Sequence, residues 1–289
     1  KTVYQLKDYS SKKINADIQW YRGAGIVMGT IDPVQYHPLS GTIDIAGSLK
    51  LKIYTQAGNK TPRLLQSDKK ILSSWSQNSQ ILSQYTFSND SSPHLLIITD
   101  NHFKSAFDTL KTHYLKYGVQ TEILSVQDIQ LSDIQGQDTP EKIRNTILDR
   151  YLTQQLDYVL LGGDDENVPY RGLSCKVLTG GYWESSDDIP ADLYYAALDG
   201  TWDMDGDGIF GEYNDSTGYD EADLLPELAI GRMPAANIRE LDNIILKSIR
   251  YQREPVIDDL DKHSFFGEFL YHDPESWAAD YLELLIGVQ

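Results

Sequence analysis

Short runs of apolar residues alternate with longer segments of helical spacing in the middle of the chain. The run at 95–99 is continuous and rich in β-branched residues, which is typical of a strand buried on both faces. Apolar residues then recur at helical intervals from 103 to 115, as in an amphipathic helix. The same patterns predict a strand at 119–124, a helix at 139–154 and a strand at 158–161.

The start of the helix predicted at 139–154 is marked by Thr139 and Pro140. A threonine oxygen can accept a hydrogen bond from a free amide of the first turn. Proline suits the first turn because an amide there has no partner within the helix. We therefore expect Thr139 to cap this helix.

The alternation continues with a strand at 228–230, a helix at 238–251, a strand at 265–270 and a helix near 277–286. Strands that alternate with helices form parallel sheets, because each helix carries the chain back to the end of the sheet where the previous strand began. The sequence therefore predicts an α/β fold with a mostly parallel, doubly wound sheet and helices on both faces. Sites in such sheets gather at the carboxyl ends of the strands. The polar residues expected at these ends are Asp100, Asp164, Asp165, Arg232 and Glu268.

The first part of the chain has a different pattern. Short alternating runs at 42–46 and 49–54 are separated by segments that contain glycine and proline, which predicts β-hairpins. Residues 56–93 are rich in serine, glutamine and asparagine and predict a surface connector. We divide the chain into a β-rich segment, a connector, an α/β unit and the start of a second unit, at 1–75, 76–91, 92–255 and 256–289.

The charge balance restricts the partners of the chain. Its 25 basic and 43 acidic residues give a net charge of -18, which repels nucleic acid and anionic lipid. No apolar stretch reaches the length of about 18 residues that a membrane helix needs, so we expect no membrane insertion. The one cysteine, Cys175, excludes an internal disulfide and a zinc site built from several cysteines.

An aspartate-rich loop at 203–212 (DMDGDGIFGE) is the sharpest chemical signal. Carboxylates at the first, third and fifth positions, followed by glycine, let a tight loop direct alternate oxygens inward. Hard oxygen donors of this kind select calcium over metals that prefer softer ligands. The predicted Ca²⁺ ligands are the side chains of Asp203, Asp205, Asp207 and Glu212 and the backbone carbonyl of Ile209.

The loop departs from the EF-hand pattern, because Glu212 stands at its tenth position and Asn214 at its twelfth. It is therefore predicted to be a shortened loop without flanking EF-hand helices. Further carboxylates follow between 215 and 223, so a second ion or a shared ligand set stays open. The alternative is a solvated acidic turn. Two carboxylates about 4 Å apart repel by roughly 4 kcal/mol at an effective dielectric constant near 20, which favours a bound cation.

Several segments of this chain resemble the gingipain family of cysteine peptidases. Those that carry the resemblance are 94–100 (HLLIITD), 158–164 (YVLLGGD) with Val168 and Pro169, 192–196 (DLYYA) and 230–234 (IGRMP). Residues 33–38 (PVQYHP) are similar to the end of that family's β-rich pro-region. The resemblance covers most of the chain, and the order of the segments is more specific than any one of them.

The resemblance implies a secreted or cell-surface cysteine endopeptidase with two caspase-like α/β subdomains. Residues 1–75 would be the end of the pro-region, 92–255 the first, non-catalytic subdomain, and 256–289 the truncated start of the catalytic one. The partners implied are the remainder of the catalytic subdomain and protein or peptide substrates.

The family's catalytic histidine precedes a glycine, and none of the six histidines here does. We therefore expect the Cys/His dyad to lie beyond this chain and this fragment alone to be inactive. Cys175 is interpreted as an ordinary free thiol, with a nucleophile as the alternative. Glu268 is similar in place to the carboxylate that orients the family's histidine, and a solvent-facing glutamate is the alternative.

The sequence is also compatible with two other classes of protein function. The first is a calcium-binding surface or adhesion module without peptidase activity, which the β-rich start and the acidic surface also fit. The second is a receiver-type or nucleotide-binding domain. Residues 162–165 (GGDD) lack the glycine pattern of a dinucleotide site and have no cluster of basic residues beside them, which disfavours this class.

Overall fold

The structure is a computed structural model that describes most of the chain between residues 14 and 278. The described residues are 14–31, 34–48, 52, 54, 63–89, 92–179, 182–212, 220, 222–260, 262, 264, 267, 269–272 and 275–278. The chain forms two compact units, Lys1–Leu241 and Asp242–Gln289.

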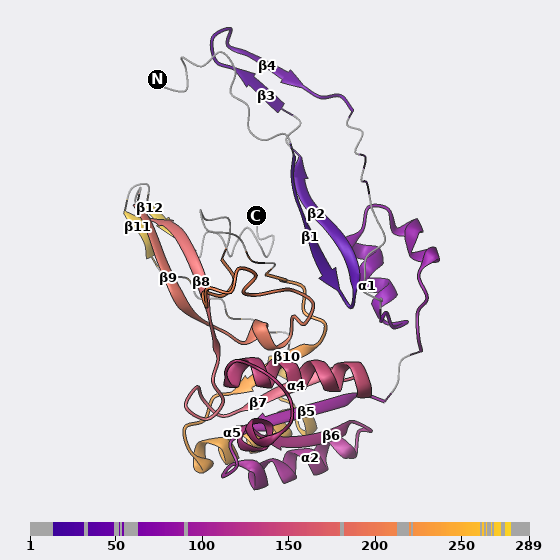
Figure 1. Ribbon diagram of the computed structural model, residues 1–289, viewed down its shortest axis with the longest axis vertical. Helices are drawn as coiled ribbons and strands as arrows, with labels where there is room; N and C mark the ends of the chain where they lie inside the picture. Colours follow the sequence, from indigo (N-terminus) through magenta and orange to yellow (C-terminus); the bar gives the residue numbers. More distant parts are fainter. Residues whose placement is uncertain are drawn as a thin grey trace. The chain divides into compact units, whose positions relative to one another are not determined.

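The first unit contains a sheet of four parallel strands (Figure 1). These strands are β5 (His94–Thr99), β6 (Gln120–Ser125), β7 (Tyr158–Gly162) and β10 (Ala229–Met233). Their order is β10-β7-β5-β6, and all three pairings are parallel. The predicted α/β fold is confirmed. The connections leave β5 and β7 toward opposite edges of the sheet, so the carboxyl ends of these two strands form its topological switch point.

Helices lie on both faces of this sheet. Figure 1 shows α4 (Thr139–Gln154) on one face and α2 (Phe107–Leu115) on the other. Alternate strand residues such as Leu96 and Leu161 pack in one buried cluster with Ile143 of α4. Next to Leu161, Gly162 faces α2: a Cβ atom at this glycine would lie 2.2 Å from Cζ of Phe107. The absence of a side chain at Gly162 therefore lets α2 approach the sheet closely.

Side chains define where the helices of the sheet begin. The short α3 (Val126–Leu131) follows β6 directly, and Ser125 and Asp128 form a reciprocal capping box. Asp138 caps α4 by accepting the Glu141 amide proton at 2.9 Å. The prediction that Thr139 caps this helix was wrong, because Thr139 is already its first helical residue. The 3-10 helix η3 (Lys104–Ala106) precedes α2.

An antiparallel hairpin follows the sheet strand β7. Its strands are β8 (Arg171–Thr179) and β9 (Tyr182–Ala191), and the 3-10 helix η4 (Asp192–Tyr195) comes directly after them. Cys175 lies on β8 opposite Ser186. Its side chain is exposed, as expected of an ordinary free thiol.

The N-terminal part of the first unit is built from two hairpins and short helices. Strand β1 (Ile14–Tyr21) pairs with β2 (Ala24–Ile31), and β3 (Val34–His37) pairs with β4 (Thr42–Ile45). The strand predicted at 49–54 falls mostly outside the described residues. The predicted connector contains regular structure, namely α1 (Asp68–Trp75) and the 3-10 helix η2 (Ser79–Gln84). Leu72 and Leu82 of these helices are buried in one cluster with Tyr21 and Leu64.

The helix α5 (Ile238–Arg253) begins in the first unit and ends in the second. The second unit also contains η5 (Ile257–Asp259), β11 (Phe269–His272) and β12 (Glu275–Trp277). Residues 265, 266 and 268 of the strand predicted at 265–270 lie outside the described residues, and β11 forms an antiparallel hairpin with β12 rather than a parallel pairing. The helix predicted near 277–286 falls largely outside the described residues.

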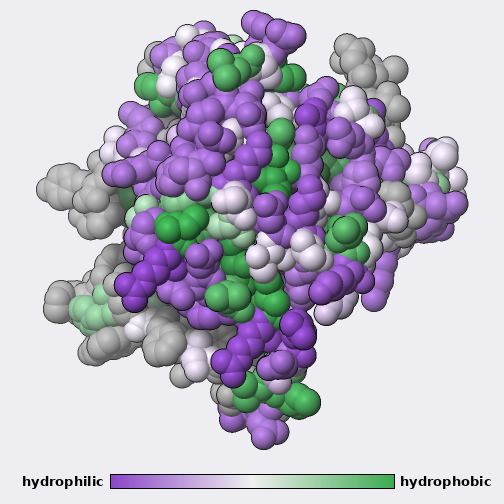
Figure 2. Space-filling view, turned by 90° about the horizontal axis from the view of Figure 1, so that it is seen from below, coloured by the Kyte–Doolittle hydropathy of each residue, from purple (hydrophilic) through white to green (hydrophobic). Residues whose placement is uncertain are grey.

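Figure 2 shows a face on which hydrophilic side chains predominate, with smaller apolar patches between them. Among the described residues, no helix is both long and apolar enough to span a bilayer.

Candidate metal centre and carboxyl edge of the sheet

The aspartate-rich loop is anchored at both ends by aromatic side chains. Trp202 and Phe210 each pack edge-on against Tyr194 of η4, with ring centroids 5.8 and 6.0 Å apart. The Gly211 amide donates to the Trp202 carbonyl at 2.8 Å and closes the loop. Trp202 is buried in the core beneath α4, and Phe210 packs against this core. The loop is therefore fixed to the α/β unit although most of its residues are exposed.

The predicted ligands are turned inward by hydrogen bonds to the backbone of the loop. Asp203 accepts the amide protons of Gly206 and Gly208 at 2.9 and 3.2 Å. Asp207 accepts the amide proton of Ile209 at 2.8 Å. Gly206 and Gly208 have φ angles of 76° and 88°, a conformation that glycine adopts at little cost. These contacts fix the orientation of the Asp203 and Asp207 carboxylates.

Two overlapping groups of carboxylates result. One oxygen each of Asp203, Asp205 and Asp220 lie within 4.8 Å of one another, and the same holds for Asp205, Asp207 and Glu212. Each of the four predicted side-chain ligands thus belongs to one of two groups that share Asp205. Residues 213–219, which follow the loop directly, lie outside the described residues, so the absence of flanking EF-hand helices stays a prediction. The carbonyl oxygen of Ile209 stays a predicted ligand.

Asp220 is the residue that the loop pattern did not identify. Its carboxylate accepts the Met204 amide proton at 2.6 Å and the Glu212 amide proton at 2.9 Å. Only 7% of Asp220 is exposed, and it joins the two ends of the loop. In the sequence, Asp220 is one of several acidic residues downstream of the loop, and no local spacing connects position 220 to position 203.

Arg171 of β8 contacts the aromatic side chains that anchor the loop. Its guanidinium carbon lies 3.8 Å from the centre of the Phe210 ring and 4.8 Å from that of Tyr194. The same group donates two hydrogen bonds to the Asp138 carboxylate, at 2.8 and 2.7 Å. Burial opposes ionisation of Asp138, but these bonds and the Glu141 amide lower its pKa below the usual value. The loop is thus connected through Arg171 to the start of α4.

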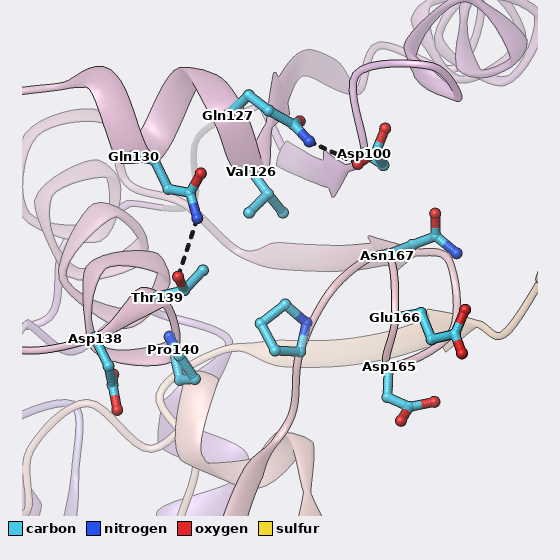
Figure 3. A pocket seen from close by; sticks show the side chains of 11 residues that line it. Asp100, Val126, Gln127, Gln130, Asp138, Thr139, Pro140, Asp165, Glu166 and Asn167 are labelled. Carbon is cyan, nitrogen blue, oxygen red and sulfur yellow. Dashed lines mark hydrogen bonds between the residues drawn. The ribbon is translucent and has the colours of Figure 1, made fainter.

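A separate open pocket lies at the carboxyl edge of the sheet (Figure 3). Its volume is about 460 Å³, and it lies beside the switch point between β5 and β7. Asp100 accepts a hydrogen bond from Gln127 at 2.6 Å on one side, and Asp165 and Glu166 line the other. None of the residues lining this pocket is a lysine or arginine, which disfavours a phosphate or nucleotide ligand.

The predicted catalytic carboxylate falls outside the described residues. Glu268 is not placed, so its proposed role in orienting a histidine stays a prediction. Asp100 and His102 are in direct contact at the end of β5, and His102 is exposed. Cys175 lies on β8 of the peripheral hairpin rather than at a carboxyl end of the parallel sheet.

A protein-family model described as Peptidase family C25 matches residues 88–275. This range includes the four parallel strands, the aspartate-rich loop and β11. None of the curated proteins compared matches the chain.

Three solved structures are similar to the chain at low identity. One described as a protease is 18% identical with a TM-score of 0.39, covering 60% of this chain and 31% of that one. The complex of Porphyromonas gingivalis RgpB pro- and mature domains is 19% identical with a TM-score of 0.35, covering 55% and 29%. Dimeric latent PorU from the same organism is 17% identical with a TM-score of 0.37, covering 67% and 18%. The chain thus spans less than a third of each of these proteins.

Proposed function

Because the chain belongs to Peptidase family C25, the gingipain family, we propose that it is the non-catalytic, calcium-stabilised part of a cysteine endopeptidase. The observation that carries this proposal is the family match over residues 88–275. It favours the peptidase over the adhesion module. Residues 92–255 would form the first caspase-like subdomain and 256–289 the beginning of the catalytic subdomain. Residues 1–75 would be the end of a pro-region, and 76–91 a connector.

The donor set supports calcium as the metal of the aspartate-rich loop. Two groups of three carboxylates, which share Asp205, lie there, and among the described residues neither group contains histidine or cysteine. Oxygen donors of this kind match the preference of Ca²⁺ for six to eight hard ligands. Asp203, Asp205, Asp207, Glu212 and Asp220 would hold the ion, together with the Ile209 carbonyl. The ion would neutralise their mutual repulsion and join residue 220 to the loop.

Peptide hydrolysis by a cysteine peptidase requires a thiolate with a base in hydrogen-bond reach. The resemblance places the Cys/His dyad in the catalytic subdomain beyond this chain, with Glu268 as the carboxylate that orients the histidine. The partners of the chain would be the rest of that subdomain and protein or peptide substrates. The parent protein would be extracellular or on the cell surface. The acidic net charge supports neither nucleic acid nor a membrane as a partner.

Comparison of the 289-residue chain with a longer polypeptide from the same precursor tests the peptidase assignment. We expect the longer protein to cleave a peptide substrate in a thiol-dependent reaction, and the shorter chain to show none. Cys175→Ala in the longer protein should leave the rate unchanged, since Cys175 is exposed on β8. Thiol-dependent cleavage by the 289-residue chain that Cys175→Ala abolishes would overturn the assignment.

A further inference from the structure

The β8–β9 hairpin has little cover beyond its base. Among the described residues, β8 and β9 pair only with each other (Figure 1). Residues 175–177 and 185–190 are all exposed. Consecutive strand residues point to opposite faces, so both faces of the hairpin are in contact with solvent. Because an isolated two-stranded hairpin is only marginally stable in water, the contacts at its base decide how firmly it is held.

The base of the hairpin is bound to the aspartate-rich loop. The Ser174 amide donates to the Phe210 carbonyl at 2.7 Å. The register of the two strands shifts between Leu173 and Cys175, so Ser174 alone stands opposite two residues of β9. Such a bulge interrupts the ladder between the strands. The bond from Ser174 to the loop thus lies where the hairpin is held least by its own pairing.

The Phe210 ring contacts the base of the hairpin on the side of each strand. Arg171 is the first residue of β8, and its guanidinium carbon lies 3.8 Å from the centre of this ring. Tyr194, which follows β9 in η4, packs edge-on against it with the ring centroids 6.0 Å apart. The neighbouring Gly211 lies against β8, because a Cβ atom there would be 3.6 Å from Cδ2 of Leu173. The end of the loop is therefore packed against the start of β8 and the segment after β9.

The place of Phe210 depends on the carboxylates on either side of it. Asp207 precedes Phe210 in the sequence and Glu212 follows it. One oxygen each of these two residues and Asp205 lie within 4.8 Å of one another. Without a cation, the repulsion between these carboxylates opposes the conformation of the segment between positions 207 and 212. An ion that binds both would close this segment and hold the Phe210 ring against Arg171.

We propose that calcium at the aspartate-rich loop controls how firmly the β8–β9 hairpin is held on the α/β unit, with Phe210 as the residue that couples the two. This inference rests on the calcium site of the proposed function, but not on peptidase activity. With the ion bound, Phe210 keeps its contacts with Ser174 and Arg171. Without the ion, these two contacts open and the hairpin is loosened from its base outward.

The loosening is confined to the hairpin, because other contacts of its base do not involve the loop. Arg171 donates two hydrogen bonds to Asp138 at the start of α4, at 2.8 and 2.7 Å. On the side of β9, Arg232 of β10 donates two hydrogen bonds to Asp192, at 2.8 and 2.7 Å. Both strands therefore stay joined to the α/β unit, and the amides of the hairpin exchange with water through local opening.

Hydrogen exchange followed by mass spectrometry tests this inference on the whole chain at pH 7, with about 10 mM Ca²⁺ or with EGTA. Labelling times of seconds to minutes report local opening rather than global unfolding. We expect peptides from β8 and β9 to exchange about tenfold faster in EGTA, since a hydrogen bond and a cation–π contact are lost. Peptides from β5 should stay protected under both conditions, because the opening does not reach the parallel sheet.

Two variants separate the coupling from calcium binding itself. Phe210→Ala removes the ring but keeps every predicted carboxylate ligand, so calcium should still raise the melting temperature. The hairpin amides of this variant should exchange at the fast rate with and without calcium. Phe87→Ala is a matched control, because Phe87 is a half-buried phenylalanine that packs against the N-terminal cluster. This control should keep the response of the wild type to calcium.

The outcomes distinguish a failure of the coupling from a failure of the calcium site. If calcium raises the melting temperature but leaves the exchange of the hairpin unchanged, the coupling is overturned and the calcium site stands. The same holds if Phe210→Ala keeps the wild-type response. If calcium changes neither the melting temperature nor the exchange, the calcium site fails and the inference fails with it.

Discussion

Replacing Arg232 by methionine should lower the free energy of unfolding of the α/β unit by about 3 kcal/mol. Arg232 lies on β10, and its side chain is 16% exposed. Its guanidinium group donates two hydrogen bonds to Asp192, at 2.8 and 2.7 Å. It also donates to the carbonyls of Gly163, Asp164 and Val168, at 3.0, 3.2 and 2.7 Å. The substitution therefore leaves a carboxylate and three carbonyl groups without this partner.

The magnitude comes from the cost of an unpaired group. Removing one partner of a buried ion pair costs about 3–5 kcal/mol, and the partial exposure of Asp192 puts the expected value near the lower end. Urea unfolding followed by far-ultraviolet circular dichroism at pH 7 measures it. Arg232→Lys is the matched control: it keeps the charge but loses the planar fork, so its loss should be intermediate. A loss below about 1 kcal/mol in Arg232→Met would refute this reasoning.

Two further substitutions test the packing and the helix start. Gly162→Ala should destabilise the unit by about 1–3 kcal/mol, because the added methyl would overlap the buried Phe107 ring. In the double variant Gly162→Ala/Phe107→Leu, the smaller leucine should remove part of this overlap, so the total loss should be less than the sum of the two single losses. Losses that simply add would contradict the overlap. Asp138→Ala should cost about 2 kcal/mol, since it removes both the cap of α4 and the Arg171 pair. The pKa of Asp138 is lowered in the folded state, so the ionised carboxylate is the form that stabilises the fold. The loss caused by Asp138→Ala should therefore become smaller as pH falls below the ordinary pKa of a carboxyl group. Thr139→Ala should cost less than about 0.5 kcal/mol, and equal losses at the two positions would contradict the assigned cap.

The parallel sheet could be predicted because its strands are continuous apolar runs. Residues 95–99 are buried on both faces in β5, so their pattern depended little on tertiary context. The hairpin β8–β9 gave no comparable signal. Residues 185–190 are polar, acidic or proline except for Ile189, and all are exposed. A strand of this composition is stabilised by its partner rather than by its own preference.

Carboxylates that are neighbours in the sequence could likewise be predicted as a site, whereas those brought together by the fold could not. Asp203, Asp205 and Asp207 are neighbours in the sequence, and the glycines between them indicate a tight loop. Asp220 has no fixed spacing from them and is brought in by backbone hydrogen bonds. The group of Asp199, Asp223 and Glu227 is brought together by the fold, and Glu227 and Asp199 accept the amide protons of Arg22 and Gly23. No local pattern could have identified it.

Calcium binding by the aspartate-rich loop is tested most directly by the melting temperature of the chain at pH 7, with about 10 mM Ca²⁺ or with EGTA. At a hundredfold excess over the dissociation constant, the ion adds about 2.7 kcal/mol to the free energy of unfolding. This corresponds to a rise of roughly 5–10 °C for a unit of this size. Asp205→Asn, which alters the residue shared by both carboxylate groups, should lose most of this rise. The control Asp133→Asn, at an exposed site outside the loop, should keep it. An identical melting temperature with calcium and with EGTA would contradict the proposed calcium site.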